Sequence, residues 1–244
     1  MKILAIGNSF AQDAMHYLHN IARADGVDVQ AVNLYIGGCT LERHYRNLLG
    51  NKRDYTLQYN GHSTSFPMSL EEALTNREWD VVIMHQASPV CTKIETYFPY
   101  MQVLADAVRR YQPHAKLVVN QTWSYEDGCE RMEKFMHYTD ANRMFTELEA
   151  AYNEAAERIH ADGMIRSGAL FHMLTEKGIE KIHRDTYHAS RGVGRYALGL
   201  LWYHSLCGVD ITENTFSDFD VPVTAEEVAL VKSCVSTFEP LFKA

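Results

Sequence analysis

The sequence predicts an α/β fold built on a mainly parallel β-sheet. Apolar runs of strand length alternate with longer segments of helical period, which is the pattern of βαβ units. The chain has 244 residues, of which 46% are hydrophobic, enough for a full core without disulfides or metals. No internal repeat, linker or low-complexity tract divides it. We therefore expect a single domain over residues 1–244.

Each predicted element follows from its apolar pattern. Four apolar runs followed by polar or glycine-containing sequence predict strands over residues 3–6, 27–35, 80–84 and 116–120. Apolar residues at helical spacing predict helices over residues 9–26, 103–111, 142–160, 190–208 and 225–238. Residues 50–68, which are polar and turn-rich, and residues 122–141, which are rich in aromatic side chains, fit neither pattern.

Composition and charge exclude several classes of protein. The formal net charge of −8 has the wrong sign for binding a nucleic-acid backbone or an anionic membrane surface. The apolar run at the N-terminus is too short for a signal peptide, and no run approaches the length of a membrane span. The five cysteines are scattered and form no C-x-x-C pair, as is typical of reduced thiols. We expect a soluble, cytoplasmic protein.

Ser9 lies between the first predicted strand and the first predicted helix. Ligands of parallel sheets bind at the carboxyl ends of the strands, and a hydroxyl there lies beside the free N–H groups of a helix N-terminus. Ser9 is therefore a candidate nucleophile, but serine is also a frequent N-cap residue, and both interpretations remain open. The G-x-S-x-G elbow of α/β-hydrolases does not fit, because that motif follows several earlier strands.

Asp185 and His188 form an Asp-x-x-His sequence just before a predicted helix. This spacing can bring a carboxylate to one imidazole nitrogen while the other nitrogen faces a nucleophile. Asp13 and His16 have the same spacing, so the pattern alone is weak. His16 is seven residues beyond Ser9 on one predicted helix, about 10 Å along its axis, and cannot reach the Ser9 hydroxyl.

Two further loops offer donors for a developing oxyanion. Gly38 follows the second predicted strand and allows a backbone N–H to approach closely, and Gln86 follows the third with a side-chain amide. Thus Ser9, Gly38 and Gln86 follow successive strands, and the Asp-x-x-His sequence completes the order. This joint pattern is more informative than any one of its parts.

These residues resemble the sequence blocks of the SGNH (GDSL-like) hydrolases, a family of serine esterases and lipases. The first block is similar to residues 7–10, although Asn8 stands where aspartate is usual. The second-block glycine matches Gly38, and the last block matches residues 185–188. Residues 7–10, 37–42 and His44 look like a little-characterised bacterial branch of that family. The third block departs from Gly-x-Asn-Asp, because residues 85–88 read His-Gln-Ala-Ser.

The resemblance implies a fold, an activity and a role for each matching residue. It implies a three-layer α/β/α sandwich with a flavodoxin-like sheet of about five strands. Ser9 would be the nucleophile, His188 the base and Asp185 the residue that orients His188. The N–H groups of Ser9 and Gly38 and the Gln86 side chain would bind the oxyanion. The implied activity is hydrolysis of a small ester, an O-acetyl group on a carbohydrate being one candidate, without a cofactor.

Other residues admit more than one interpretation. Asn8 and Trp123 are assigned to substrate binding, Trp123 because it follows the fourth predicted strand; its ring could stack on a sugar or simply cover an apolar edge. The closest histidine pairs, His16 with His19 and His183 with His188, are accompanied by no metal-binding motif, so no metal is expected. The altered third block leaves open a catalytically inactive protein that binds carbohydrate or another small ligand. Acyl chain length, preference for esters or thioesters, and oligomeric state are not determined by the sequence.

Overall fold

A computed structural model of the chain describes residues 1–243 and contains one seven-stranded sheet in the order β4-β3-β2-β1-β5-β6-β7. Five strands are parallel: β2, β1, β5, β6 and β7. Numbered along the chain among themselves, they have the flavodoxin-like order 2-1-3-4-5. The predicted fold class is confirmed. The strands are β1 (Lys2–Gly7), β2 (Gln30–Tyr35), β3 (Tyr55–Tyr59), β4 (His62–Met68), β5 (Val81–Met84), β6 (Lys116–Gln121) and β7 (Gly163–Arg166).

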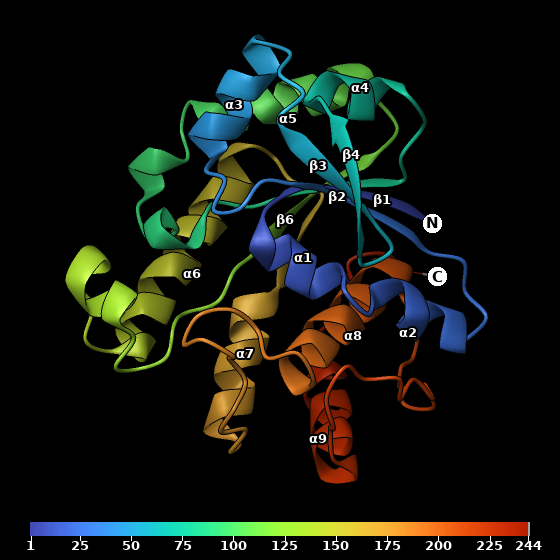
Figure 1. Cartoon of the computed structure of the whole chain (residues 1–244), viewed down its shortest axis with the longest axis vertical. Coiled ribbons are helices and arrows are strands. Elements are labelled where there is room, and N and C mark those ends of the chain that lie inside the picture. Colours follow the sequence, from blue (N-terminus) through green and yellow to red (C-terminus); the bar gives the residue numbers. More distant parts are fainter. Residues whose placement is uncertain (244) are drawn as a thin grey trace.

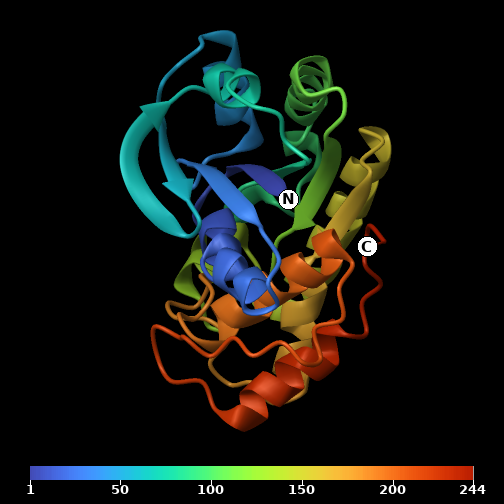
Figure 2. The same ribbon diagram turned by 90° about the vertical axis from the view of Figure 1, so that its right-hand side faces the viewer.

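The expectation of about five strands was too low, because an antiparallel hairpin extends one edge of the sheet. Strands β3 and β4 pair with each other, and β3 pairs antiparallel to β2. Nearly all of β4 is exposed, so it lacks the apolar alternation that indicates a strand. Its turn holds Asn60 and Gly61, both at positive φ, and an Asn-Gly pair is a strong hairpin signal. Figure 2 shows the curved hairpin at the edge of the molecule.

Helices cover both faces of the sheet (Figure 1). On one side lie α3 (Leu41–Leu49), α4 (Leu70–Thr75), α5 (Tyr100–Tyr111) and α6 (Ala141–Arg158). On the other side lie α1 (Ser9–Met15), α2 (Leu18–Ala24), α7 (Ser167–Glu176), α8 (Val193–Cys207) and α9 (Ala225–Val235). The helix predicted over residues 9–26 is two helices. Helices α3, α4 and α7 and the short edge strand β7 were not predicted.

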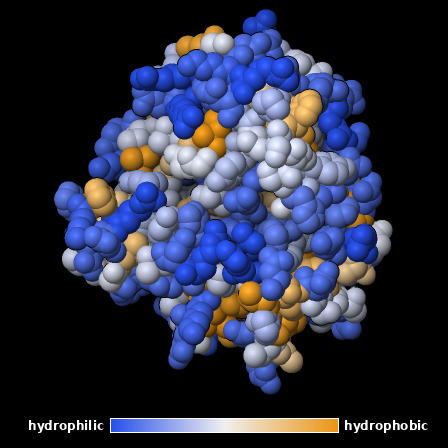
Figure 3. All heavy atoms as spheres, viewed as in Figure 1, coloured by the Kyte–Doolittle hydropathy of each residue, from blue (hydrophilic) through white to orange (hydrophobic). Residues whose placement is uncertain are grey.

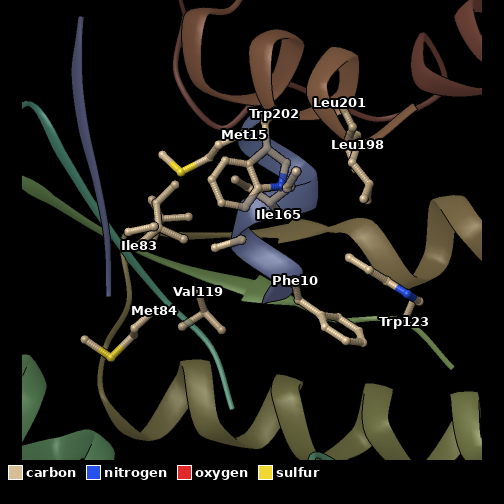
Figure 4. Packing of buried hydrophobic residues seen from close by; sticks show 14 of the residues in the cluster. Phe10, Met15, Ile83, Met84, Val119, Trp123, Ile165, Leu198, Leu201 and Trp202 are labelled. Carbon is tan, nitrogen blue, oxygen red and sulfur yellow. The ribbon is translucent and has the colours of Figure 1, made fainter. Parts of the chain in front are cut away.

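Helix α8 forms the centre of one helical layer. It packs against α1, α2, α7 and α9 as well as β7, which explains why it is apolar on nearly every side. Trp202 of α8 lies beside Met15 and the sheet residue Ile165 in the core, and Leu198 and Leu201 of the same helix belong to the same cluster (Figure 4). This packing fixes α1 against the sheet, and the residue at the start of α1 is Ser9.

The surface seen in Figure 3 is mostly hydrophilic, with hydrophobic atoms gathered towards its lower part. Among residues 1–243, no helix has both the length and the apolar composition needed to cross a bilayer.

Candidate active site

The candidate site begins where β1 ends and α1 starts. Asn8 is the N-cap of α1, and its Oδ1 atom accepts a hydrogen bond of 2.9 Å from the Phe10 N–H. Ser9 is the first helical residue and not the cap that the alternative interpretation required. Because Asn8 performs the capping, the Ser9 hydroxyl is free to bond to a side chain elsewhere.

The Ser9 hydroxyl lies at one end of a chain of three side chains. His188 Nε2 is 2.9 Å from Ser9 Oγ, and His188 Nδ1 is 2.8 Å from Asp185 Oδ2. The other carboxylate oxygen of Asp185 accepts a hydrogen bond of 2.8 Å from the His188 backbone N–H. The structure therefore brings Asp185 and His188 to Ser9, although Ser9 and His188 are 179 positions apart in the sequence. In this geometry Nδ1–H donates to the carboxylate and Nε2 faces the hydroxyl as an acceptor.

The hydrogen bonds from His188 keep the Asp185 carboxylate ionised. Partial burial raises the pKa of Asp185, but the ring and backbone N–H groups of His188 lower it by more. The net pKa lies below the usual value, so the carboxylate is negative throughout the neutral range. A negative carboxylate on Nδ1 stabilises an imidazolium, the form that His188 takes when it removes a proton from Ser9.

Several contacts hold the loop of residues 184–188 in place. Thr186 adopts a left-handed conformation with φ of 70°, and the Arg184 N–H donates to the His188 carbonyl at 3.0 Å, which closes a tight turn. The Glu126 N–H donates to the Thr186 carbonyl at 2.8 Å, and Trp123 Nε1–H donates to the Tyr187 carbonyl at 2.8 Å. The aromatic stretch after β6 therefore supports the loop that carries His188.

Trp123 does not face the pocket, contrary to its assignment to substrate binding. Its side chain is fully buried, and its ring stacks on Phe10 with centroids 4.1 Å apart (Figure 4). A ring that contacts Phe10 on one side and Phe171 on another has no face left for a sugar. Trp123 instead packs beneath the site, between α1 and α7.

A buried carboxylate joins α1 to the same loop. Asp13 is fully buried, and its carboxylate accepts hydrogen bonds of 2.9 Å from Arg184 and from Arg195. It also accepts one of 3.2 Å from the Ala189 N–H. Arg184 and Ala189 flank residues 185–188 on both sides. Asp13 therefore links the helix that begins at Ser9 to both ends of the segment that carries Asp185 and His188.

The loop after β2 supplies a free backbone donor. Gly38 has φ of +60°, a conformation that non-glycine residues rarely adopt. A Cβ atom there would meet nothing within 4 Å, so the glycine is required by its backbone conformation and the position faces open space. Within residues 1–243 its N–H has no backbone acceptor. The Ser9 N–H, in the first turn of α1, likewise lacks an intrahelical partner.

Asn8 holds the two loops that carry these donors together. Its Nδ2 atom donates to the Cys39 carbonyl at 3.2 Å, and Asn33 Nδ2 donates to the Asn8 carbonyl at 3.3 Å. Asn8 lines the pocket at Ser9, and its side chain is buried and bonded to protein atoms, so the contacts that the structure shows for this side chain are positioning contacts. Gly7 allows the close approach, since a Cβ atom there would lie 2.4 Å from Asn33 Oδ1.

The Gln86 amide is not directed at Ser9, contrary to its predicted place in the oxyanion hole. Gln86 is buried, and its Nε2 atom donates to the carbonyl and the hydroxyl of Thr96 at 2.9 and 3.1 Å. Its Oε1 atom accepts from the N–H groups of Leu41 and Ala87. Both ends of the amide are occupied, so Gln86 joins the start of α3 to the loop after β5.

The pocket at Ser9 has a volume of about 370 Å³ and is lined by residues that the sequence analysis missed. Ser88, two residues after Gln86, is one of them, and its hydroxyl lies 2.7 Å from the Tyr125 hydroxyl. Tyr187 and Arg131 line it as well. Tyr187 could have been found, because it lies inside the Asp-x-x-His sequence. No sequence pattern indicated Arg131.

Two buried histidines lie behind the loops of the site. His85 Nε2 is 3.0 Å from Asn8 Oδ1, and His44 Nδ1 is 2.9 Å from the Tyr55 hydroxyl. Because Asn8 Oδ1 can only accept, Nε2 of His85 carries a proton. Burial lowers the pKa of His85 to about 4 and that of His44 to about 3, so both rings are neutral at pH 7.

No metal centre is formed by the residues that the structure describes. Within residues 1–243, no three histidine, cysteine, aspartate or glutamate side chains are placed to hold a metal ion. The histidines noted in pairs have other partners: His16 Nε2 contacts Asp220, and His183 contacts Glu126.

The fold and the site can be compared with known proteins. The chain matches the model of DUF4886, described as a domain of unknown function, over residues 2–236. A crystal structure of a DUF4886 family protein from Bacteroides uniformis has a TM-score of 0.89 and 28% identity, covering 97% of this chain and 93% of that one. The search of curated proteins returned no match.

More distant solved structures share the fold. A "putative SGNH hydrolase" from Slackia heliotrinireducens has a TM-score of 0.62 and 24% identity, covering 84% of this chain and 97% of that one. Axe2, an acetylxylan esterase from Geobacillus stearothermophilus, has a TM-score of 0.55 and 13% identity, covering 83% and 93%. The chain belongs to the DUF4886 family, and this family shares the fold of the SGNH hydrolases.

Proposed function

We propose that the protein is a serine ester hydrolase that acts through an acyl-enzyme on a small ester. The observation that carries the proposal is the hydrogen-bonded chain from Ser9 through His188 to Asp185 at the carboxyl ends of the parallel strands. A serine that merely caps a helix has no need of an imidazole held in this orientation by a carboxylate. The SGNH fold of the family also favours a hydrolase.

The reaction would proceed in two steps. Ser9 Oγ attacks the ester carbonyl carbon while His188 Nε2 takes its proton, and the ionised Asp185 stabilises the resulting imidazolium. The tetrahedral intermediate collapses, the alcohol leaves with the proton from His188, and the acyl group remains on Ser9. Water, activated by His188, then attacks the acyl-enzyme and releases the carboxylic acid.

The oxyanion would be bound by two backbone N–H groups and one hydroxyl. The N–H groups of Ser9 and Gly38 are free donors at the pocket. Ser88 can take the place that the buried Gln86 amide leaves, because Tyr125 can donate to Ser88 Oγ and leave the Ser88 proton for the oxyanion. Burial raises the pKa of Tyr125, so its hydroxyl keeps the proton that this bond requires.

The preference for a short acyl group, acetyl on a carbohydrate among the candidates, rests on analogy with the fold. The sequence contains no long apolar segment that could form a lid over a long acyl chain. A thioester would be cleaved by the same residues.

The test compares p-nitrophenyl acetate, butyrate and octanoate with wild type, Ser9→Ala and His188→Ala. Acetate hydrolysis should be highest in the wild type and fall by at least about 10³-fold in both variants, because the nucleophile and its base act as a unit. Circular dichroism and thermal unfolding establish that the variants are folded. Hydrolysis that survives Ser9→Ala would overturn the proposal.

A second candidate is a protein that binds a small ligand, such as a carbohydrate, without turnover. The altered third block and the occupied Gln86 amide favour it. Labelling with a fluorophosphonate separates the two candidates: an activated Ser9 is labelled in the wild type but not in His188→Ala. A wild type that resists labelling and cleaves no ester would support the binding protein.

A further inference from the structure

A single cation, Arg131, lines the pocket that contains Ser9. Its guanidinium carbon lies 4.9 Å from the centroid of the Tyr187 ring, and that ring lies 4.3 Å from the His188 ring, centroid to centroid. Tyr187 therefore contacts both the guanidinium and the imidazole that faces Ser9. A cation stacked on an aromatic face in this way is held in place while its N–H groups remain available.

Arg131 forms no ion pair with any of residues 1–243, although acidic residues surround it in the sequence. Three of these acids have other partners: Glu130 pairs with Lys134, Glu126 with His183, and Asp127 accepts from the Ala141 N–H. The Tyr125 hydroxyl, which Arg131 also approaches, is neutral. The guanidinium thus keeps an unneutralised charge at the pocket of a protein whose formal net charge is −8.

The position of Arg131 indicates which part of an ester substrate its charge would contact. His188 must reach the oxygen of the departing alcohol to protonate it, so the alcohol lies on the His188 side of the scissile bond. Because Arg131 and His188 are neighbours of the same ring, the guanidinium lies near the part of the pocket that the alcohol would occupy.

We propose that Arg131 binds a carboxylate on the alcohol part of the ester, so that the substrate is an acyl ester of a carboxylate-bearing alcohol such as an acidic sugar. This inference rests on the proposed esterase function. A carboxylate matches the two-pronged geometry of a guanidinium and is neutralised by one arginine. A phosphate monoester, with nearly two negative charges, would keep an uncompensated charge beside this single cation.

The test uses two acetate esters with matched leaving groups. One is the acetate of a nitrophenol that carries a ring carboxylate, and the other is the same ester with an uncharged carboxamide in place of the carboxylate. Wild type should favour the carboxylate ester by about tenfold in kcat/KM, as expected for one partly exposed charge-assisted hydrogen-bonded pair. Arg131→Gln should abolish that preference.

Lys134→Gln is the matched control. Lys134 is an exposed cation on the same segment, and its replacement removes the same charge as Arg131→Gln. The preference should persist in this variant. A wild type with no preference, a preference that survives Arg131→Gln, or equal losses in both variants would overturn the inference. Equal losses would show that the preference comes from the net electrostatic field of the protein and not from a contact with Arg131.

Two further measurements separate this inference from the proposed function. Hydrolysis that requires Ser9 but has the same kcat/KM for the carboxylate and carboxamide esters would overturn only the carboxylate site at Arg131. Hydrolysis unaffected by Ser9→Ala would overturn the proposed esterase function. Calorimetric binding of the free carboxylate-bearing nitrophenol requires no turnover. It should bind wild type about tenfold more tightly than Arg131→Gln, and equal affinities would contradict the assignment of Arg131.

Discussion

Two Asp-x-x-His sequences in this chain have the same spacing and different structures. In the loop before α8, Asp185 contacts its own His188 through both the ring and the backbone N–H. In α1, Asp13 contacts Arg184 and Arg195, while His16 contacts Asp220, which is 204 residues away. The first sequence forms a pair that faces Ser9, and the second forms two separate contacts.

The difference is produced by the backbone. The left-handed conformation at Thr186 turns the chain so that one carboxylate reaches both the ring and the N–H three residues later. The helical backbone of α1 instead directs Asp13 into the interior, where its charge requires buried partners. The two sequences are nevertheless connected, because Arg184, a partner of Asp13, immediately precedes Asp185. Residues 185–188 carry the proposed catalytic pair, and Asp13 anchors the loop that holds them.

The largest effect should follow from breaking the pair in the loop. Asp185→Asn keeps the shape of the side chain but removes its charge and offers the wrong partner to Nδ1–H of His188. We expect kcat for p-nitrophenyl acetate to fall by about 10²- to 10⁴-fold with little change in stability. Steady-state kinetics and thermal unfolding measure the two quantities. A variant with more than half of the wild-type kcat would show that Asp185 does not orient His188.

The anchor in α1 should act mainly on stability. Asp13→Asn leaves the charges of two arginines without their buried partner, and such a loss costs about 3–5 kcal/mol in the free energy of unfolding. Urea unfolding measures that cost. Asp220→Asn is the control, because Asp220 contacts Arg195 from a side chain that is 44% exposed, and it should cost about 1 kcal/mol or less. Equal costs in the two variants would contradict the role assigned to Asp13.

Some features of the fold and the site are predictable from the sequence, and others are not. Four of the five parallel strands, Ser9, Gly38 and the Asp185–His188 pair were predicted, since apolar period and motif order are local properties. The placements of Gln86 and Trp123 were not, because each depends on partners from distant segments: Thr96 for Gln86, Tyr187 and Phe10 for Trp123. Arg131 was missed for a related reason. An exposed arginine has no apolar pattern, and only the fold shows that it borders the pocket.

The two buried histidines, His44 and His85, make the stability of the protein depend on pH. In the unfolded chain they take up protons near pH 6.5, whereas in the folded protein burial lowers the pKa of His85 to about 4 and of His44 to about 3. Between these values the unfolded state binds more protons, so stability falls as pH falls. From pH 7.5 to pH 5 each should cost about 2 kcal/mol.

Urea unfolding at both pH values measures this loss. His44→Gln should make the pH-dependent loss smaller by about 2 kcal/mol. His62→Gln, which replaces an exposed histidine on β4, should leave the loss unchanged. A pH dependence that is equal in His44→Gln and wild type would contradict the assignment of this loss to the buried rings.

The smallest effect is expected at His16, the counterpart of His188 in the second sequence. Burial, together with Arg195, lowers the pKa of His16 despite the opposing effect of Asp220, so at pH 7 the neutral ring donates a hydrogen bond to the Asp220 carboxylate. This bond is partly exposed, with side-chain exposures of 18% and 44%. His16→Ala should therefore cost less than about 1 kcal/mol in unfolding free energy and change kcat less than about twofold, because His16 bonds neither to Ser9 nor to residues 185–188. If His16→Ala abolished ester hydrolysis as His188→Ala is expected to do, spacing rather than backbone conformation would govern which histidine acts.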